Sequence, residues 1–240
     1  MSAPKYKRVL LKLSGEAFAG PDRNGISGET ILAIAEEVKK AWETGVQIGI
    51  VIGAGNIVRG ASLALPGLNR TVGDNMGMLG TVINCLALMT VLKSLGVPAR
   101  VMTAIEMNKV AEFFTAEKAA EHLEQGQVVI FGGGTGNPFF TTDTASALKA
   151  LEIGADVMLK ATNVDGVYTA DPKKDPSAVK FDTLSQKKAL DMGLKVMDGA
   201  AFALCRDNKL PIIVFDIKGQ GNIMKAASGE KIGTFVCPEE

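Results

Sequence analysis

A glycine cluster in residues 132–146, GGGTGNPFFTTDTAS, leads through two threonines into Asp143 and a helix-like run. Glycines let backbone N–H groups approach an anion, and a helix N-terminus adds partial positive charge. Hydroxyl donors are available at Thr141, Thr142 and Thr144. Asp143 adds a carboxylate that can organise a metal ion or a group of phosphates. The segment predicts a phosphate pocket, and an ordinary strand–turn–helix junction capped by Thr141 or Thr142 stays open as the alternative.

Two further glycine turns follow apolar runs. KLSG at residues 12–15 ends the first run with a lysine that can reach phosphate oxygens and with the hydroxyl of Ser14. GAGNIVRG at residues 53–60 follows the second run and carries Arg59. Val58 stands where the dinucleotide fingerprint requires its third glycine, which disfavours a Rossmann dehydrogenase. For both turns, a purely structural role at the end of a strand remains the alternative interpretation.

Polar and aromatic residues gather in residues 159–172, LKATNVDGVYTADP. Lys160 can neutralise charge on a transferring phosphoryl group, Tyr168 can contact a base, and Asp171 can hold a ribose or a phosphate-linked metal. The Asp-Gly pair at 165–166 predicts a hairpin turn whatever the function is.

Two aspartates each permit two interpretations. Asp74 lies in RTVGDNMGMLG, where a long helix is expected to start, and Asp198 in KVMDGAAF precedes another helix. Each fits a helix N-cap. Asp74 also fits an acceptor for the two hydroxyls of a ribose, and Asp198 a role in positioning a metal or a lysine. The spacing does not choose between these roles.

The composition narrows the reaction class. The single histidine, His122, lies in the polar stretch EKAAEHLEQG, where we expect an exposed helix face. Without it, Ser-His-Asp hydrolysis, Cys-His proteolysis and His-ligated metal chemistry lose an essential member. Because 26 basic residues balance 26 acidic ones, no net field recruits nucleic acid or an anionic membrane. Phosphoryl transfer, which depends on lysines, carboxylates and backbone amides, fits best.

The remaining composition favours a soluble, cytoplasmic protein. Three scattered cysteines, Cys85, Cys205 and Cys237, argue against a disulfide framework or a zinc site and read as packing residues. Lys12 interrupts the first apolar run, and no small-residue cleavage site follows it, so no secretory signal is expected. No stretch approaches the roughly 20 apolar residues that span a bilayer.

Strand-like and helix-like patterns alternate along the chain. We expect strands at residues 8–13, 46–52, 99–103, 127–131 and 157–160, and helices at 31–42, 74–95, 115–124 and 142–153. A further helix opens near Ser185 after a turn-rich stretch that begins beyond residue 160. The alternation predicts an α/β fold with a mainly parallel sheet covered on both faces, whose ligands bind beyond the carboxyl ends of the strands. We expect one domain, residues 1–240, with lobes 1–160 and 161–240 sharing one sheet.

Six motifs occur in the order and spacing found in the bacterial uridylate kinases of the amino acid kinase family. They are KLSG, GAGNIVRG, VGDNMGM, GTGNPFFTTD, LKATNVDGVYTADP and KVMDGAAFALCRDNKLPI, and the resemblance spans residues 6–236. It implies the three-layer α/β/α sandwich of that family and transfer of the ATP γ-phosphate to UMP. It further implies Mg²⁺ with ATP, a homohexamer, an ATP side in lobe 161–240 and a UMP side in lobe 1–160.

Site residues follow from the resemblance by position. The catalytic charge organisers are Lys12, Asp143, Lys160 and Asp198. The ATP contacts are Lys12, Leu13, Ser14, Gly15, Gly55, Arg59, Thr162, Asn163, Tyr168 and Asp171. The UMP contacts are Ala54, Asp74, Thr135, Gly136, Asn137, Pro138, Phe139, Phe140, Thr141 and Thr142. No dedicated protein site for a metal is implied, because ATP phosphates hold Mg²⁺.

Regulation is also implied by the resemblance. UTP is an expected inhibitor, because a site that accepts UMP can accept the end product. GTP is a possible effector, with Lys93, Arg100 and one loop as its contacts. That loop consists of Gly20, Pro21, Asp22, Arg23, Asn24 and Gly25.

One position departs from the pattern. Many relatives have three successive glycines where this chain has Gly53, Ala54 and Gly55. A backbone N–H contact survives the added methyl group unless Ala54 needs a positive φ.

The residues also define a mechanism and its alternatives. The nucleophile would be a phosphate oxygen of UMP, which is largely ionised at neutral pH, so no histidine base is required. Lys12 and Lys160 would stabilise charge in the transition state while Asp143 orients them. The alternatives are a kinase for a carboxylate or carbamate, such as an acetylglutamate or aspartate kinase, and a noncatalytic storage or sensing protein of the same fold.

Overall fold

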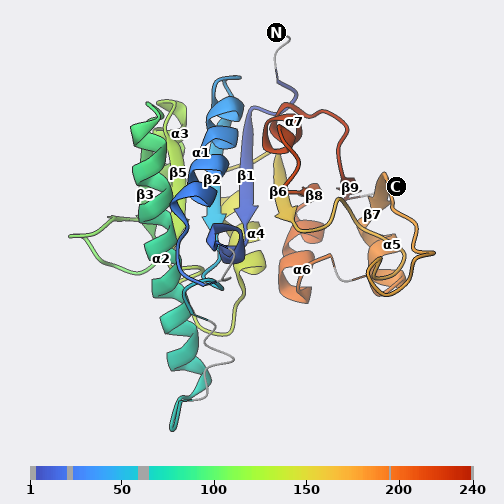
Figure 1. Cartoon of the computed structure of the whole chain (residues 1–240), viewed down its shortest axis with the longest axis horizontal. Helices are drawn as coiled ribbons and strands as arrows, with labels where there is room; N and C mark the ends of the chain where they lie inside the picture. Colours follow the sequence, from blue (N-terminus) through green and yellow to red (C-terminus); the bar gives the residue numbers. More distant parts are fainter. Residues whose placement is uncertain (1–3, 21–23, 59–64, 195, 239–240) are drawn as a thin grey trace.

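A nine-stranded sheet forms the middle of the computed structural model, which describes residues 4–20, 24–58, 65–194 and 196–238 (Figure 1). In spatial order its strands are β4 (Glu112–Phe113), β3 (Ala99–Thr103), β5 (Val128–Gly132), β2 (Gln47–Ile52), β1 (Arg8–Leu13), β6 (Val157–Thr162), β8 (Ile212–Asp216), β9 (Thr234–Cys237) and β7 (Thr183–Ser185). All neighbouring strands are parallel except β8 and β9. The expectation of a mainly parallel α/β sheet is confirmed.

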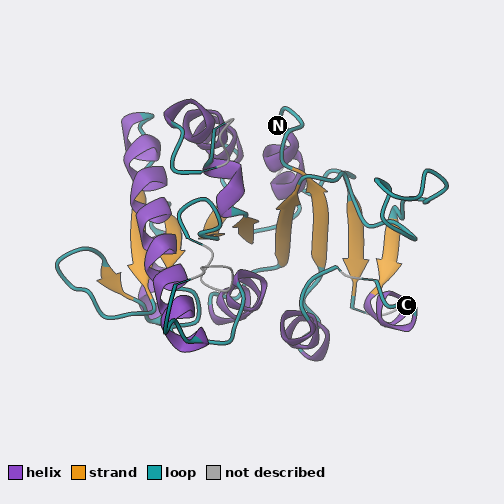
Figure 2. Cartoon of the chain, turned by 60° about the horizontal axis from the view of Figure 1, so that its bottom comes forward, coloured by secondary structure: helices purple, strands orange, loops and turns teal. Residues whose placement is uncertain are grey.

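Helices cover both faces of this sheet (Figure 2). The elements are η1 (Gly15–Phe18), α1 (Gly28–Trp42), α2 (Arg70–Ser94), α3 (Ala116–Glu124), α4 (Thr142–Glu152), α5 (Gln186–Asp191), α6 (Gly199–Asp207) and α7 (Asn222–Ser228). Helices α1, α2 and α7 pack on one face, and α3, α4, α5 and α6 pack on the other. The result is a three-layer α/β/α sandwich.

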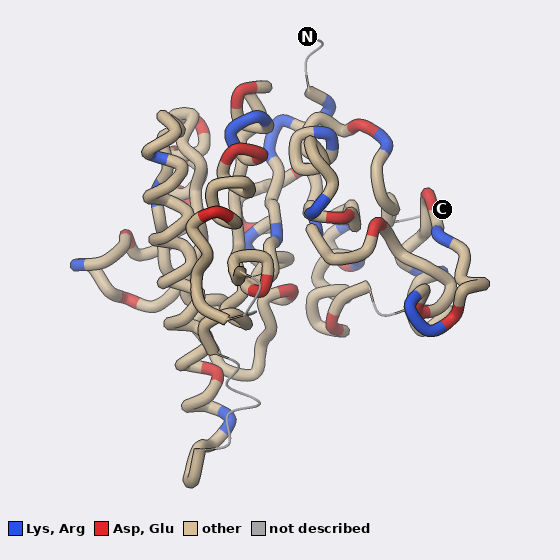
Figure 3. The backbone as a smooth tube through the Cα atoms, viewed as in Figure 1, with Lys and Arg blue, Asp and Glu red and all other residues tan. Residues whose placement is uncertain are grey.

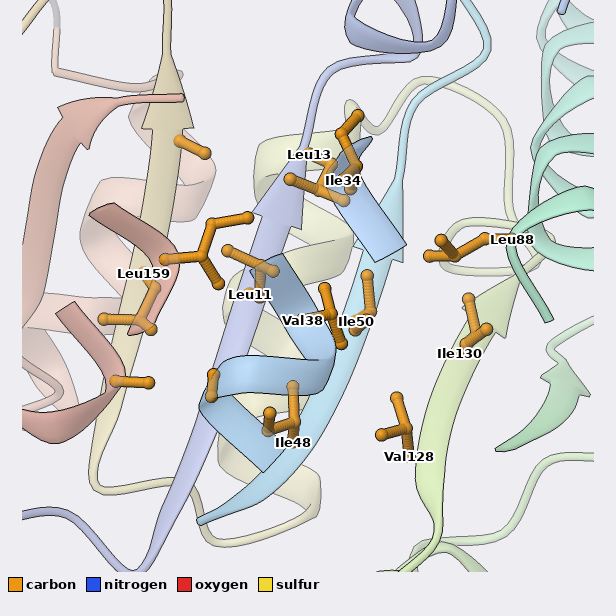
Figure 4. Packing of buried hydrophobic residues seen from close by; sticks show 14 of the residues in the cluster. Leu11, Leu13, Ile34, Val38, Ile48, Ile50, Leu88, Val128, Ile130 and Leu159 are labelled. Carbon is orange, nitrogen blue, oxygen red and sulfur yellow. The ribbon is translucent and has the colours of Figure 1, made fainter. Parts of the chain in front are cut away.

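The two cores follow from side-chain alternation along the strands. On β1, Leu11 and Leu13 enter the core beneath α1, while Leu10 enters the opposite core beneath α4. Figure 4 shows Leu11 beside Ile50 and Val38 in the first of these cores. Central strands are apolar on both sides because both of their faces are covered.

The start of α2 differs from the expectation. The helix begins at Arg70, four residues before Asp74, and Asn69 is its N-cap, with its side-chain oxygen 2.9 Å from the Val72 nitrogen. Asp74 therefore lies inside the first turns and is not a cap. Asn69 was overlooked because the glycine at position 73 obscured the helical pattern before it.

The prediction that residues 165–166 form the hairpin turn is wrong. The hairpin pairs residues 167–169 with 179–181, since Thr169 N–H bonds to Val179 O and Phe181 N–H to Val167 O. The turn-forming segment is thus 170–178, and Gly166 precedes the hairpin without a positive φ. A Cβ at Gly166 would lie 2.6 Å from Thr234 Oγ1, so the glycine serves a close approach to β9.

Two further expectations, the exposure of His122 and the lack of a long apolar stretch, also need correction. The His122 side chain is only 15% exposed, and its Nε2 lies 3.0 Å from Glu112 Oε2. By length and mean hydropathy, α2 is apolar enough to cross a membrane, contrary to the expectation that no stretch of the chain is. Its apolar character has another explanation, because Cys85, Leu88 and Leu92 on one face of α2 pack into the core against the sheet.

Acidic and basic positions are distributed over all layers of the described chain (Figure 3). Cys85 and Cys205 are buried, as packing residues should be, and Cys237 is partly buried.

Candidate functional site

The carboxyl ends of the parallel strands meet along one edge of the sheet, at the lower side of Figure 1. KLSG spans the end of β1, the turn at residues 53–55 comes directly after β2, and the glycine cluster begins at the last residue of β5. Thus the three glycine turns that are far apart in sequence lie at one edge, as a doubly covered parallel sheet predicts.

Two lysines and one carboxylate form the centre of this edge. Lys12 on β1 and Lys160 on β6 are register partners, so their side chains leave the sheet on the same side. Asp143, in the first turn of α4, receives both: Lys12 Nζ lies 3.0 Å from Oδ1, and Lys160 Nζ lies 2.6 Å from Oδ2. The three side chains are between 11% and 15% exposed. The cluster carries one net positive charge in a largely buried place, which suits a polyanion.

The cluster shifts the ionisation of its own members. Burial raises the pKa of Asp143, but the charges of Lys12 and Lys160 outweigh burial, so the pKa lies below its ordinary value. Burial lowers the pKa of Lys160, and the attraction of Asp143 only partly offsets this. Because one carboxylate is shared between two ammonium groups, the pKa of Asp143 and the pKa of Lys160 both lie below their ordinary values.

Asp198 combines two structural tasks. It caps α6, accepting hydrogen bonds from the N–H groups of Ala200 and Ala201 at 3.0 Å. It also accepts from the hydroxyls of Thr141 and Thr144 at the start of α4. In the described residues Asp198 makes no ion pair with a lysine. The capping interpretation holds, and the aspartate joins the N-termini of α4 and α6.

Thr141 is the N-cap of α4, accepting from the N–H groups of Asp143 and Thr144. The capping alternative for the threonine pair is therefore correct at Thr141. It does not exclude a phosphate pocket, since the same cap places Asp143 in the first turn beside both lysines.

The first two glycine turns touch each other. A Cβ at Gly15 would lie 2.5 Å from the Gly53 carbonyl oxygen and 2.6 Å from the Gly55 nitrogen. Only glycine allows this approach of two strand ends. Ala54 has no positive φ, so its methyl group leaves the backbone N–H available.

One group of the expected UMP contacts meets at the start of α2. Asp74 Oδ2 accepts a hydrogen bond from Phe139 N–H at 2.8 Å, which brings together residues 65 positions apart. Arg70 Nε donates to both carboxylate oxygens of Asp74, at 2.8 and 2.7 Å. Phe139 adopts φ 72° and is 64% exposed. The loop from Thr135 to Thr142, with Gly136, Asn137, Pro138 and Phe140, thus lies between Asp74 and α4.

The expected ATP contacts are partly assembled. Gly55 and Asn163 line one groove together with the residues after β8. Thr162, Tyr168 and Asp171 make local turn contacts: Thr162 donates to Val164 O, Tyr168 to Asp165, and Asp171 accepts from Lys173 N–H. The Leu13 side chain is buried in the core, so only its backbone is available. Arg59 lies outside the described residues.

Sequence reasoning missed the loop after β8. Ile217, Lys218, Gly219 and Gln220 line the same groove as Gly55 and Asn163. The signal was present, because DIKGQG is a lysine-bearing glycine turn directly after a strand. Lys218 adds a cation to the lining of this groove.

The expected effector residues do not come together. Asn24 lines the groove with Gly55, whereas Lys93 and Arg100 line a separate hollow near β4 with Lys109 and Lys118. In that hollow Arg100 is already 3.4 Å from Glu112. Gly20 and Gly25 belong to the Asn24 side, and Pro21, Asp22 and Arg23 lie outside the described residues.

The carboxylates of the edge are not arranged as a metal cage. Over the described ranges, no group of three or more His, Cys, Asp or Glu side chains is placed to hold a metal ion. The oxygens of Asp143 face two lysines, and those of Asp198 face hydroxyls and helix N–H groups. A divalent metal fits this edge when phosphate oxygens supply most of its ligands.

Known proteins resemble this chain in sequence and in fold. The profile of the amino acid kinase family matches residues 7–216. Uridylate kinase of Bacteroides thetaiotaomicron is 56% identical over 232 residues, which are 97% of this chain and 98% of that protein. UMP kinase from Bacillus anthracis has a similar structure, with TM-score 0.94, 42% identity and coverage of 98% and 97% of the two chains. UMP kinase from Ureaplasma parvum aligns with TM-score 0.91 and 36% identity, over 97% of this chain and 99% of that one. Motifs, fold and near-complete coverage agree, and the chain belongs to the amino acid kinase family.

Proposed function

We propose that this chain transfers the γ-phosphate of ATP to UMP, giving UDP and ADP. The observation that carries the proposal is the pair of lysines held by Asp143 where the glycine turns converge. Relatives that cover almost the whole chain are named uridylate or UMP kinases. Synthesis of pyrimidine nucleotides is the corresponding role.

The chemistry requires two polyanions to approach each other. A phosphate oxygen of UMP attacks the γ-phosphorus, the bond to the β-phosphate oxygen of ATP breaks, and ADP leaves. Lys12 and Lys160 neutralise negative charge on the oxygens of the transferring group. Asp143 fixes both ammonium groups in one geometry, so their positioning costs little when the nucleotides arrive.

The nucleotides occupy the two sides of the lysine cluster. We assign the UMP side to lobe 1–160, where Ala54, Asp74 and residues 135–142 lie, and the ATP side mainly to lobe 161–240. When UMP binds, the Asp74 carboxylate would release its hydrogen bonds from Arg70 and accept hydrogen bonds from the ribose hydroxyls instead. The groove of Gly55, Asn163 and Lys218 would hold ATP.

A divalent metal accompanies ATP in this reaction, and we propose Mg²⁺. It enters as the Mg-ATP substrate, because no cage of metal-ligating side chains occurs at this edge among the residues that the structure describes. The metal neutralises phosphate charge, and the two lysines act on the remaining oxygens.

The test is a substrate panel. Purified protein is incubated with Mg-ATP and UMP, CMP, dUMP, TMP, AMP or GMP, and ADP release is followed with chromatographic identification of the product. We expect selective formation of UDP. Binding of ATP without any turnover would instead support a storage or sensing protein, and turnover of acetylglutamate or aspartate would support a carboxylate kinase.

Assembly and regulation belong to the same proposal. Val72, Leu79 and Ile83 form an exposed apolar stripe on α2, with 47%, 50% and 48% of each residue accessible. A second copy of the chain would cover this stripe in a homohexamer. UTP is the proposed inhibitor through the UMP site, GTP a possible effector, and the cytoplasm the proposed location.

Assembly can be measured directly by light scattering during size-exclusion chromatography. A hexamer is expected for the unaltered chain. Leu79→Glu places a charge in the stripe and should produce smaller species, whereas Leu190→Glu, at an equally exposed leucine on α5, should not.

A further inference from the structure

Two buried asparagines lie behind the turn at residues 53–55. Asn84 on α2 is fully buried, and Asn56 is 2% exposed. Their side-chain amides pair reciprocally: Asn56 Nδ2 donates to Asn84 Oδ1 at 3.0 Å, and Asn84 Nδ2 donates to Asn56 Oδ1 at 2.8 Å. Each amide group has a second proton, and both of these go to backbone carbonyls.

The two carbonyls belong to segments of the candidate site. Asn84 Nδ2 donates to Gly53 O at 2.8 Å, and Asn56 Nδ2 donates to Gly25 O at 2.8 Å. Gly25 N–H in turn donates to the backbone oxygen of Asn56 at 2.8 Å. The turn after β2, the middle of α2 and the Gly25 segment are therefore one hydrogen-bonded unit.

Stability alone does not require this pair. Buried amides gain little net free energy over apolar side chains of the same shape, because their hydrogen bonds mainly offset the cost of leaving water. The pair does fix the Gly53 carbonyl. In a planar trans peptide the C=O and the following N–H point in opposite directions, so Ala54 N–H is directed away from α2. Within the described chain, the N–H groups of Ala54 and Gly55 have no hydrogen-bond partner.

We propose that Asn84 and Asn56 are positioning residues for phosphoryl transfer. They hold the turn so that the N–H groups of Ala54 and Gly55 face the phosphates of the two nucleotides. Neither asparagine touches a nucleotide. The inference rests on the proposed function, since it assigns these amides to the reacting phosphates.

The pair permits a test that separates positioning from folding. Asn84→Leu leaves the Asn56 amide buried without its partner and should lower both Tm and kcat. The double variant Asn56→Leu/Asn84→Leu removes both amides and should recover the part of Tm that the unpaired Asn56 amide costs, although the Gly53 and Gly25 carbonyls still lack their donors. If the pair positions the turn, kcat of the double variant stays about 10- to 100-fold below that of the unaltered chain, with KM for UMP changed far less. Recovery of kcat together with Tm would overturn the proposal.

A second substitution covers the case in which leucine is not accommodated. Asn84→Asp keeps the shape and loses both N–H donors. A buried carboxyl has a raised pKa, and its protonated form can donate to the Gly53 carbonyl. Turnover relative to the unaltered chain should therefore improve as pH falls. A ratio that stays low at every pH, with no gain toward acid, would contradict positioning through this carbonyl.

The matched control is Gln186→Leu. Gln186 is also fully buried and donates from Nε2 to Leu210 O at 3.0 Å, but it lies on α5, away from the glycine turns. This variant should lower Tm and leave kcat unchanged. An equal loss of kcat in the control would show that any buried amide is needed for folding, and would overturn the assignment.

Two separate measurements distinguish failure of the proposed function from failure of the asparagine assignment. If the unaltered chain forms no UDP, that function is wrong whatever the variants do. Amide hydrogen exchange of the 53–55 turn, measured with and without Mg-ATP, then still reports on the asparagine pair. Faster exchange there in the double variant than in Gln186→Leu supports anchoring of the turn, and equal exchange rates contradict it.

Discussion

At the scale of single residues, the centre of the site is a shared carboxylate. Lys12 and Lys160 extend from register partners on adjacent strands, and Asp143 lies between their ammonium groups at 3.0 and 2.6 Å. Two like charges this close repel, so without Asp143 the two ammonium groups would move apart. The carboxylate holds both ammonium groups in place before any nucleotide binds.

Asp143→Asn tests this role. The change keeps the shape and removes the charge, so turnover should fall by about two orders of magnitude, as for other preorganised electrostatic groups. Nucleotide affinity, measured by calorimetry, should change much less. Glu152→Gln is the control, because it removes the partner of another buried lysine, Lys149, on the same helix. Equal losses of turnover and affinity in Asp143→Asn would disprove the orienting role.

The lowered pKa of Lys160 gives a second prediction. Burial holds the pKa of Lys160 below the ordinary 10.5 in the free protein. Phosphates bound beside the ammonium group favour its charged form and raise that pKa, so between the two values the complex holds more protons than the free protein. Binding of Mg-ATP and UMP, measured over a series of alkaline pH values up to the ordinary lysine pKa of 10.5, should take up protons, since UMP is fully ionised throughout that range.

Calorimetry in buffers of different ionisation enthalpy measures this uptake. Lys160→Arg should abolish it, because a guanidinium stays protonated throughout this range. Uptake of the same size in that variant would assign the proton to another group.

At the scale of elements, α2 has two functional faces. One face carries Asp74, Thr81 and Asn84, which hold Phe139 N–H, Gly133 N–H and Gly53 O respectively. The opposite face carries the exposed apolar stripe. The helix therefore holds the turn at residues 53–55, the glycine cluster after β5 and the loop that follows this cluster. A displacement of α2 by a neighbouring copy would reach all three attachment points together.

The contact between α2 and the β2 turn is tight at one position. A Cβ at Gly80 would lie 2.9 Å from the Ala54 Cβ, which is fixed to the backbone of the turn. Alanine favours the helix by about 1 kcal/mol over glycine, but overpacking costs about 1–3 kcal/mol. We expect Gly80→Ala to be destabilising in urea unfolding and to lower kcat.

Two companions make this test specific. In an Ala54→Gly background the clashing methyl is absent, so Gly80→Ala should be neutral or stabilising there. Gly77→Ala has open space on the same helix and should stabilise by up to about 1 kcal/mol. Additive effects of the two changes at positions 54 and 80 would rule out direct packing between α2 and the turn.

At the scale of the whole molecule, the two proposed lobes, 1–160 and 161–240, contribute strands to one continuous sheet. β1 pairs with β2 on one side and with β6 on the other, and β6 pairs with β8. Lys12 and Lys160 occupy the junction, so opening the sheet there would also separate the charge cluster.

This continuity predicts cooperative unfolding. The single tryptophan, Trp42, lies on α1 and donates to Gly126 O, so its fluorescence reports on lobe 1–160. Far-UV circular dichroism reports on both lobes. The two urea transitions should coincide, as expected for one cooperative unit. A fluorescence transition at clearly lower urea would mean that the lobes unfold separately.

Much of the fold was predictable because local patterns decide it. The strands at 8–13 and 99–103 were placed to the residue, since apolar runs bounded by glycine, proline or charge have few alternatives. The start of α2 and the role of Gly166 were not. Arg70 and Asn69 belong to a weak helical pattern. Gly166 is required by the close approach of Thr234, which lies 68 positions away in the sequence.

The sequence by itself determined the family of chemistry: glycine turns after strands, lysines and carboxylates without a usable histidine, and motifs in a fixed order. Tertiary structure alone decided which of these residues meet. Lys12 and Lys160 are brought together by strand register, Asp198 faces threonines rather than a lysine, and Asn56 meets Asn84 behind the turn. These contacts join segments far apart in the chain, and their partners are set by packing of the layers, which local sequence patterns do not specify.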